Sequence, residues 1–317
     1  MKKLRVIVVG FNPLTRKGLQ VVRELDCCEL VGLITMPPEA ARGKSNYDPL
    51  AELAAELHEN TLYIGDINGT RAQEWIRIRN SDIILQLGWS QIFTSETLKL
   101  PRMFCVGIHP APLPVGRGAA VLNWKIIEGG GSWGNSLFIM EPTTDTGDIL
   151  DFEPFAIEKR DDIYTAFCKV DRTAAMMLRR TLPRLADGTF TAIKQDNSKA
   201  TRYRKRTPDD GRLDVNWNAE KICRYIHALT HPYPGAFFSM KLGCFLVWQA
   251  EKWKADEVDN MMPGSLVSIQ HGSGIVIQIG ENDSILLKLV TPPGDFECWA
   301  DEWASEMGLK MGQKLFD

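Results

Sequence analysis

The sequence predicts an α/β protein with a mainly parallel sheet, followed by a smaller β-rich domain. Three observations predict this fold class. Short β-branched strands alternate with amphipathic helices before residue 194, which is the pattern of a parallel sheet covered by helices on both faces. A polar and basic stretch follows. Beyond it come five short strands with glycine-rich turns, which are typical of a small open barrel or sandwich.

The first strand is expected at residues 4–9, where a β-branched run ends in Gly10. The next elements are expected as helix 14–25, strand 29–36, helix 51–57, strands 62–64, 82–87 and 104–108, a helix after residue 118, an apolar strand before residue 143, and helix 161–185. Pro183 should kink or end that last helix, because proline lacks a backbone N–H.

The C-terminal part begins at a turn cluster, residues 207–211. Asn218 can cap a helix on which Ile222, Ile226 and Leu229 share one face. Short strands are expected at 236–240, 244–248, 265–269, 275–279 and 285–290. The predicted organisation is a larger α/β domain over 1–193, a linker over 194–206 and a small β-rich domain over 207–317.

Composition argues against several classes of protein. The 317 residues carry a formal net charge of −3 and a pI of about 6.0, so no global charge favours a polyanionic partner. No window approaches the ~18 apolar residues of a membrane span, and the apolar run at the start looks more like a strand than a signal peptide. The seven cysteines lack metal-binding spacing, so reduced thiols in a cytoplasmic protein are expected.

His109 and Asp145 are the candidate catalytic residues. His109 follows the apolar strand 104–108, and the proline-rich segment after it would fix its orientation. Asp145 follows the next apolar strand, 36 residues further on. Ligands of α/β proteins bind at the carboxyl ends of parallel strands, so we expect both side chains in one site. The aspartate would orient the imidazole and collect a proton from an incoming nucleophile.

Other kinds of chemistry are disfavoured. The turn at residues 10–15 lacks the G-x-G-x-x-G spacing of a dinucleotide site. No serine or cysteine stands in a nucleophile-elbow context, so covalent catalysis is not indicated. His227 and His231 have no third ligand near them, so no metal site is expected. A histidine and an aspartate without a nucleophile fit direct transfer of a group between two bound substrates.

Two further residues near this stretch are left open by the sequence. Arg117 lies between Gly116 and Gly118, in a turn close to His109. It is either an ordinary surface arginine or an anion contact in the wall of the site. Trp124, on the helix that follows, is either a core residue or a platform for the acceptor.

The motif His-Pro-x-x-Leu-Pro-x-x-Arg-Gly at 109–118, followed by Asp-x-Gly-Asp-Ile at 145–149, resembles the formyltransferases that use N10-formyltetrahydrofolate. These include methionyl-tRNA formyltransferase, glycinamide ribonucleotide transformylase and the sugar N-formyltransferases. The resemblance covers nearly the whole chain, since 206–211 and 232–237 look like the start of the family's small C-terminal domain. It implies a Rossmann-like catalytic domain, an open, OB-like C-terminal barrel, and no metal.

The resemblance also implies which residues form the site. His109 and Asp145 match the family's histidine and aspartate, but the family's asparagine falls on Gly107. That asparagine helps to polarise the formyl oxygen, and losing one such donor typically costs about 2.7–4 kcal/mol in the transition state. Asn123, Asn135 or a backbone N–H near Gly107 are candidate replacements.

Further contacts are implied on both sides of this pair. The residues expected to contact the folate are Leu87, Gly88, Trp89, Gln91, Ile92 and Asp148. The residues expected to contact the amine substrate are Asn12, Arg117, Gly118 and Trp124.

The loop at residues 37–49 bears on the identity of the amine. Its only cations are Arg42 and Lys44, and it looks more like the loop of sugar-nucleotide formyltransferases than the long basic loop of the tRNA enzyme. We therefore expect an amino sugar on a nucleotide as the acceptor. Methionyl-tRNA, another small amine, hydrolysis of the folate and non-catalytic folate binding remain alternatives. The Trp-rich tail belongs either to the core or to the face of a homodimer.

Overall fold

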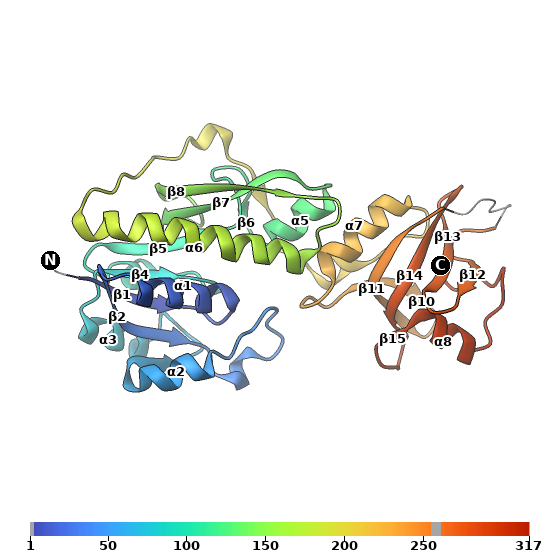
Figure 1. The fold of residues 1–317 in the computed structure, drawn as a ribbon, viewed down its shortest axis with the longest axis horizontal. Helices are drawn as coiled ribbons and strands as arrows, with labels where there is room; N and C mark the ends of the chain where they lie inside the picture. The colour runs from blue at the N-terminus through green and yellow to red at the C-terminus, as the bar shows by residue number, and fades with distance from the viewer. Residues whose placement is uncertain (1–2, 255–260, 317) are drawn as a thin grey trace. The chain divides into compact units, whose positions relative to one another are not determined.

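The computed structural model describes residues 3–254 and 261–316, which form two compact units (Figure 1). The first unit consists of Met1–Val121, Gly131–Ala156 and Phe167–Arg204. The second consists of Leu122–Gly130, Ile157–Ala166 and Lys205–Asp317. The domain boundaries at 193 and 206 stay a prediction. Among the described residues, no helix is long and apolar enough to cross a membrane.

A seven-stranded sheet organises the first unit, with the strand order β3-β2-β1-β4-β5-β7-β8. The strands are β1 Leu4–Val9, β2 Cys28–Thr35, β3 Thr61–Tyr63, β4 Ile83–Gln86, β5 Phe104–His109, β7 Gly131–Ile139 and β8 Ile149–Ile157. The first five run parallel to their neighbours, whereas β7 is antiparallel to β5. The prediction of a mainly parallel sheet is confirmed, because β-branched strands alternate with helices that return the chain to the same edge.

Helices cover both faces of this sheet. They are α1 Pro13–Glu24, α2 Ala51–Leu57, α3 Thr70–Arg79, α4 Ser95–Leu98 and most of α6 Ile163–Asp187. The helix α5, Val121–Ile127, belongs to the second unit from Leu122 on. On one face α1 and α6 bury a cluster that includes Leu19, Leu85 and Leu178. On the other face Ile7, Ile84 and other side chains pack with α3.

Pro183 does not end α6, because the helix continues to Asp187, and the alternative of a kink at Pro183 stays a prediction. Leu182 and Leu185 are both buried. Burial of apolar side chains stabilises a helix more than local propensity does. Packing therefore keeps α6 helical beyond Pro183, although proline lacks the backbone N–H.

The segment expected as a linker is packed against the first unit over part of its length. Residues Arg202–Tyr203 form β9, which pairs in parallel with β6, Arg117–Gly118. A Cβ at Gly118 would overlap the backbone of Tyr203, so this pairing requires a glycine there. The segment thereby holds the Gly-Arg-Gly turn in place.

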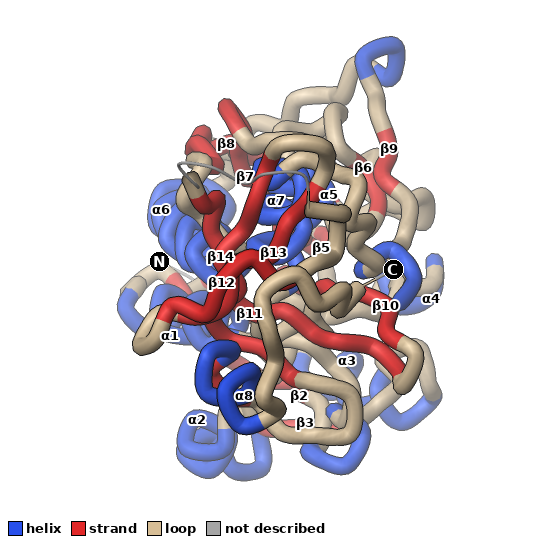
Figure 2. The backbone as a smooth tube through the Cα atoms, turned by 90° about the vertical axis from the view of Figure 1, so that its right-hand side faces the viewer, coloured by secondary structure: helices blue, strands red, loops and turns tan. Residues whose placement is uncertain are grey.

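The second unit is built on an antiparallel sheet with the path β10-β11-β14-β13-β12, to which β15 adds beside β14. Figure 2 shows the long strands β11, β13 and β14 running side by side. The elements are α7 Ala219–Leu229, β10 Ala236–Met240, β11 Gly243–Trp253, β12 Leu266–Gln270, β13 Gly274–Ile279, β14 Asp283–Thr291, β15 Cys298–Trp299 and α8 Ala300–Glu306. The predicted C-terminal β domain is confirmed, with Asn218 capping α7 as expected.

Candidate active site

His109 is the last residue of β5, and its side chain is only 9% exposed. Its Nε2 lies 2.7 Å from the carbonyl oxygen of Gly116. A carbonyl can only accept, so this contact fixes the proton on Nε2. Nδ1 is therefore the nitrogen left to face other groups.

The turn after β5 is rigid, as the prolines in it predict. Ala111 N–H donates to His109 O at 2.8 Å, and Ser136 Oγ on β7 donates to Ala111 O at 2.7 Å. Trp133 Nε1 donates to Pro110 O at 2.7 Å. These bonds hold the segment that carries Gly116, the partner of His109.

Asp145 approaches the same imidazole, with its Oδ1 3.6 Å from His109 Nδ1 and its side chain 11% exposed. The other carboxylate oxygen accepts a 2.8 Å hydrogen bond from Gly118 N–H. Asp145 has a φ of 60°, a left-handed conformation that costs energy for a residue with a side chain. The surrounding contacts hold this conformation, and such strain is characteristic of functional positions.

The sequence had suggested that His109 and Asp145 meet because they follow adjacent strands. The structure brings them together in a different way. Because β7 is antiparallel to β5, Ile139 pairs with Val106 rather than with His109. The loop after β7 starts with a bond from Met140 N–H to Cys105 O and turns back. It is this returning loop that brings Asp145 to the imidazole.

Arg117 is buried rather than being part of a mobile surface turn. Its Nε and Nη2 donate to Gln195 Oε1 at 3.2 and 2.7 Å, and Nη2 also donates to Asn197 Oδ1 at 2.7 Å. The guanidinium thus packs within the protein instead of facing the His109–Asp145 pair. Its predicted contact with the substrate stays a prediction.

Gln195 is a residue of this site that sequence analysis missed. Besides accepting from Arg117, its Nε2 donates to the carbonyls of Asp145 and Gly147, at 3.0 and 2.7 Å. It joins the turn before α5 to the loop that carries the aspartate. A polar residue in a polar segment gives no local signal, so only the folded chain reveals this role.

Gly107 lies on the same face of β5 as His109, and the space beside it is filled. It pairs with Phe138 on β7, where an added Cβ would lie 3.0 and 3.1 Å from two ring carbons and 3.2 Å from Met140 Cγ. An asparagine side chain would need room that these two apolar side chains occupy. The chain therefore departs from the family's asparagine in structure as well as in sequence.

The replacements expected for that asparagine have other partners. Asn135 Nδ2 donates to Val170 O and Thr173 Oγ1, at 3.2 and 3.1 Å. Asn123 lies in the second unit, and its Nδ2 donates to Ala228 O at 2.7 Å. Of the side-chain amides on the strands flanking Gly107, Gln86 of β4 is the one in register with it.

Gln86 donates from Nε2 to the carbonyl of Trp89. A primary amide carries two N–H groups on that nitrogen, so one of them is left over from this bond. The sequence offered no signal for Gln86, because a single polar residue at the end of an apolar strand is common at loop entrances.

The stretch at residues 87–92, expected to contact the folate, is held by neighbouring loops. Leu87 O accepts from Thr15 Oγ1, and Gly88 has a φ of +83° where a Cβ would overlap Asn12. The buried ring of Trp89 meets Phe11 edge-on, with 5.5 Å between centroids. This stretch is therefore pre-organised.

The side chains of this stretch differ in what they offer a ligand. Gln91 is engaged, because its Nε2 donates to Asp66 and its Oε1 accepts from Ile67 N–H. Ile92 is largely exposed. Backbone groups and Ile92 thus remain for the predicted contact with a pterin.

The remaining predicted residues are Asn12, Asp148 and Trp124. Asn12 caps α1 through a reciprocal bond pair with Thr15. Asp148 accepts from Ile139 N–H through its backbone carbonyl. Trp124 lies on α5 in the second unit, and its role stays a prediction.

Burial raises the pKa of the Cys105 thiol to about 12. Cys105 lies on the same face of β5 as His109 and stays protonated at neutral pH, so it cannot serve as a thiolate nucleophile. No group of three histidine, cysteine, aspartate or glutamate side chains that could hold a metal ion occurs within the described ranges.

The architecture is that of an α/β protein with a candidate histidine–aspartate site at the carboxyl end of β5. The chain belongs to the formyl transferase family, because residues 6–182 match the formyl transferase domain. Residues 205–308 match the formyl transferase C-terminal domain. It is a folate-dependent N-formyltransferase, and the resemblance drawn from its motifs is confirmed.

Sequence relatives cover nearly the whole chain. The methionyl-tRNA formyltransferase of Bacillus licheniformis is 28% identical over 292 residues, which are 92% of this chain and 91% of the relative. That of Ehrlichia ruminantium is 29% identical over 309 residues, which are 97% and 98% of the two chains.

Solved structures share the fold. HypX from Aquifex aeolicus matches with a TM-score of 0.70 at 16% identity, over 98% of this chain but only 48% of HypX, so this chain spans about half of that protein. An N-formyltransferase from Helicobacter canadensis, solved with folinic acid and dTDP-3-aminofucose, matches with a TM-score of 0.64 at 14% identity, over 90% and 99% of the two chains. At these identities the likeness concerns the fold alone.

Proposed function

We propose that this protein transfers the formyl group of N10-formyltetrahydrofolate to the primary amine of an amino sugar carried on a nucleotide. The arrangement of His109 and Asp145 carries the proposal. The 3.6 Å between Nδ1 and Oδ1 is long for a hydrogen bond. His109 Nδ1 and Asp145 Oδ1 can instead both contact the reacting formyl group, which would lie between this pair and the folate.

The proposed reaction is a direct displacement. The amine nitrogen forms a bond to the formyl carbon, the bond from that carbon to N10 breaks, and N10 gains a proton as tetrahydrofolate leaves. Asp145 takes the proton that the amine loses, directly or through water. Protonated His109 stabilises the developing oxyanion through Nδ1–H, since Nε2–H is held by Gly116 O.

Gln86 supplies a second donor to the formyl oxygen in this proposal. It stands in register with Gly107, on the face of the sheet that carries His109. Its second amide N–H can donate a hydrogen bond as the missing asparagine would, but from the neighbouring strand β4. This assignment takes account of the Phe138 ring, which closes the space at Gly107 itself.

The charge of the chain and the loop at residues 37–49 support a small acceptor. Lys44 Nζ lies 3.5 Å from Ser90 Oγ, and Asp48 forms a 2.7 Å ion pair with Arg16. The loop is thus folded onto the chain near the expected folate stretch, and one of its two cations is engaged there. A tRNA acceptor would favour a more basic surface, whereas this chain carries a net charge of −3.

Methionyl-tRNA is the second candidate acceptor. It is supported by the names of the two sequence relatives, each of which aligns with more than nine tenths of this chain. The amino-sugar candidate is supported by the ligand in the Helicobacter canadensis structure. The two candidates differ in size and charge, so one assay separates them.

The test is a panel assay with N10-formyltetrahydrofolate and either amino-sugar nucleotides or charged initiator tRNA. We expect formylation of an amino-sugar nucleotide. The variants His109→Ala and Asp145→Asn should each lower kcat by about 10²–10⁴-fold, while Asp187→Asn, at an exposed helix end, keeps wild-type turnover. Near wild-type rates in folded His109→Ala or Asp145→Asn would overturn the site assignment.

Other outcomes would change the function. Formylated methionyl-tRNA as the sole product would replace the acceptor while keeping the chemistry. Release of tetrahydrofolate and formate without any amine would identify a hydrolase.

A further inference from the structure

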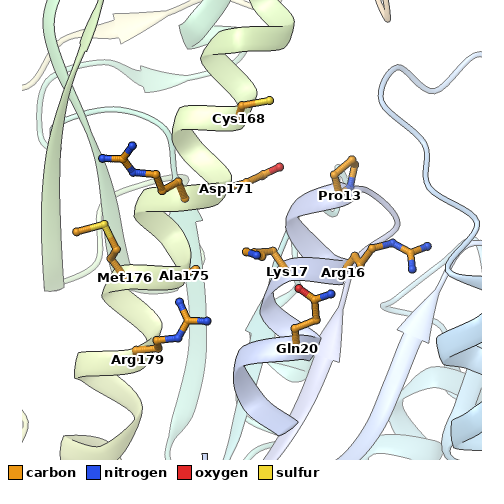
Figure 3. Close-up of a pocket in the computed structure, with 10 residues that line it drawn as sticks. Pro13, Arg16, Lys17, Gln20, Cys168, Asp171, Ala175, Met176 and Arg179 are labelled. Atoms are coloured by element: carbon orange, nitrogen blue, oxygen red, sulfur yellow. The ribbon is translucent and has the colours of Figure 1, made fainter. Parts of the chain in front are cut away.

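A groove with a volume of about 540 Å³ lies between α1 and α6 (Figure 3). Its lining comes from one face of each helix, with residues spaced three or four apart. From α1 these are Pro13, Arg16, Lys17 and Gln20, and from α6 Cys168, Asp171, Arg172, Ala175, Met176 and Arg179.

This groove is separate from the site at His109. The helices α1 and α6 pack on the face of the sheet that carries Val106, with Leu14 and Leu178 in the same cluster. His109 follows Val106 by three residues, so it points to the opposite face of β5. The groove therefore plays no part in the chemistry proposed above.

The groove has a cationic rim, and two of its four cations are already engaged. Arg16 forms two 2.7 Å bonds with Asp48, and Arg179 donates to Glu24 at 2.8 Å. Lys17 and Arg172 form no ion pair with any residue that the structure describes. In a chain of net charge −3, two such cations in one groove favour an anionic ligand.

Asp171 is the carboxylate that lines this groove, and its burial weakens its repulsion of an anionic ligand. Burial raises its pKa to about 6, and Lys17 partly offsets that effect. Because its pKa lies this close to neutrality, Asp171 can take up a proton when an anion binds beside it, which removes most of the repulsion.

The floor of the groove is apolar. Ala175 is buried and faces α1, whereas the Met176 side chain is 40% exposed and points away from α1 (Figure 3). Pro13 and Cys168 complete this apolar part near the start of both helices. Ligand sites of this volume are mostly apolar, with a few polar groups that fix the orientation of the ligand.

We propose that this groove binds a nucleoside phosphate, with the phosphates at Lys17 and Arg172 and the base against Ala175 and Pro13. The lining of α6 extends from Cys168 to Arg179, roughly 16 Å at 1.5 Å per residue. That length suits one nucleotide. A nucleic-acid duplex would call for several more cations along a wider surface.

The test uses Cys168, an exposed thiol that lines the groove, as a reporter. Alkylation rates are measured by peptide mass spectrometry in the full-length protein, with dTDP, UDP or GDP, with thymidine, with pyrophosphate and with tRNA. Cys244, an exposed thiol in the second unit, serves as the internal control. We expect a nucleoside diphosphate to slow alkylation of Cys168 and to leave the Cys244 rate unchanged.

Variants connect the protection to the groove. Lys17→Ala and Arg172→Ala should each weaken protection about tenfold, the effect of losing about 1.4 kcal/mol of charge-assisted bonding. The matched control is Arg184→Ala, an exposed arginine further along α6 that does not line the groove. Formyl transfer should be unchanged in all three variants, so a failure of the proposed function would not affect this readout.

Four results would overturn the proposal. One is an unchanged rate at Cys168 with saturating nucleotide. Another is equal protection in Lys17→Ala, Arg172→Ala and wild type. The third is stronger protection by tRNA than by any nucleoside diphosphate, which would make the groove a nucleic-acid contact. Equal protection by pyrophosphate and by dTDP would remove the base from the assignment and so contradict it as stated.

Discussion

Phe138 on β7 packs directly against Gly107 on β5, and a Cβ at 107 would lie 3.0 Å from its ring. The resemblance of the motifs implies a catalytic asparagine at position 107. The aromatic ring and the glycine are therefore coupled features of this chain. Restoring the asparagine alone would not restore its geometry.

The variant Gly107→Asn should thus be overpacked. We expect a loss of about 1–3 kcal/mol in the free energy of unfolding and no gain in kcat. In a double-mutant cycle with Phe138→Leu, the smaller side chain should relieve the clash, so the two changes together cost less than their sum. The measurement is denaturant unfolding of the four proteins. Strictly additive effects would show that Phe138 does not restrict position 107.

Gln86 is expected to contribute to the rate through its amide. Gln86→Met preserves the length of the side chain but removes both N–H groups. We expect kcat to fall by about 10²–10³-fold, the usual effect of removing one donor to an oxyanion. Folate affinity, measured as a dissociation constant in the absence of an amine, should change little.

A control separates catalysis from support of the loop, because Gln86 also bonds to the Trp89 carbonyl. If that bond dominated, folate affinity would fall along with kcat. Gln270→Met, on β12 of the second unit, should alter neither quantity. A kcat for Gln86→Met within twofold of wild type would remove Gln86 from the mechanism.

The sequence predicted those parts of the fold that depend on local pattern. The β-branched run of β1, the cap at Asn218 and the short strands of the second unit all follow from residue type and spacing. The direction of β7 did not follow, because nothing local distinguishes a parallel strand from an antiparallel one. The path of α6 past Pro183 depended on the burial of its neighbours.

The sequence likewise predicted only part of the candidate site. His109 and Asp145 stood out because each follows an apolar strand and because their motifs are specific. Gln195 did not stand out, since its four bonds reach residues more than 45 positions away. Long-range hydrogen bonds from polar segments leave no periodic trace, so only the folded chain reveals them.

Asp171 predicts a dependence of stability on pH. Burial raises its pKa from 3.8 in the unfolded chain to about 6 in the folded protein. The folded state therefore binds the Asp171 proton more tightly than the unfolded state does. The stability that this protonation contributes is fully present below pH 3.8 and is lost as the pH rises to about 6. The total loss is on the order of 2–3 kcal/mol.

Asp171→Asn should accordingly be more stable than wild type above pH 6 by a comparable amount, and about equal to it near pH 4. Thermal or denaturant unfolding between pH 4 and 8 measures this difference. Asp187, near the end of the same helix, is a control of opposite sign, because hydrogen bonds from Thr189 lower its pKa. Asp187→Asn should not gain stability at neutral pH. A flat difference between wild type and Asp171→Asn across the range would contradict the prediction.

Gln195 should support both stability and catalysis, and two substitutions separate the contributions. Gln195→Ala leaves the buried Arg117 guanidinium without its Oε1 partner, which should cost about 1–3 kcal/mol of unfolding free energy. Gln195→Glu keeps an acceptor for Arg117 but loses the N–H groups that bind the carbonyls of Asp145 and Gly147. We expect its stability to stay near that of wild type while kcat falls, because the loop that carries Asp145 is no longer fixed. Thermal unfolding and steady-state kinetics on both variants test this, with Gln73→Ala on α3 as the control. A wild-type kcat in Gln195→Glu would contradict the role of Gln195 in holding Asp145 for catalysis.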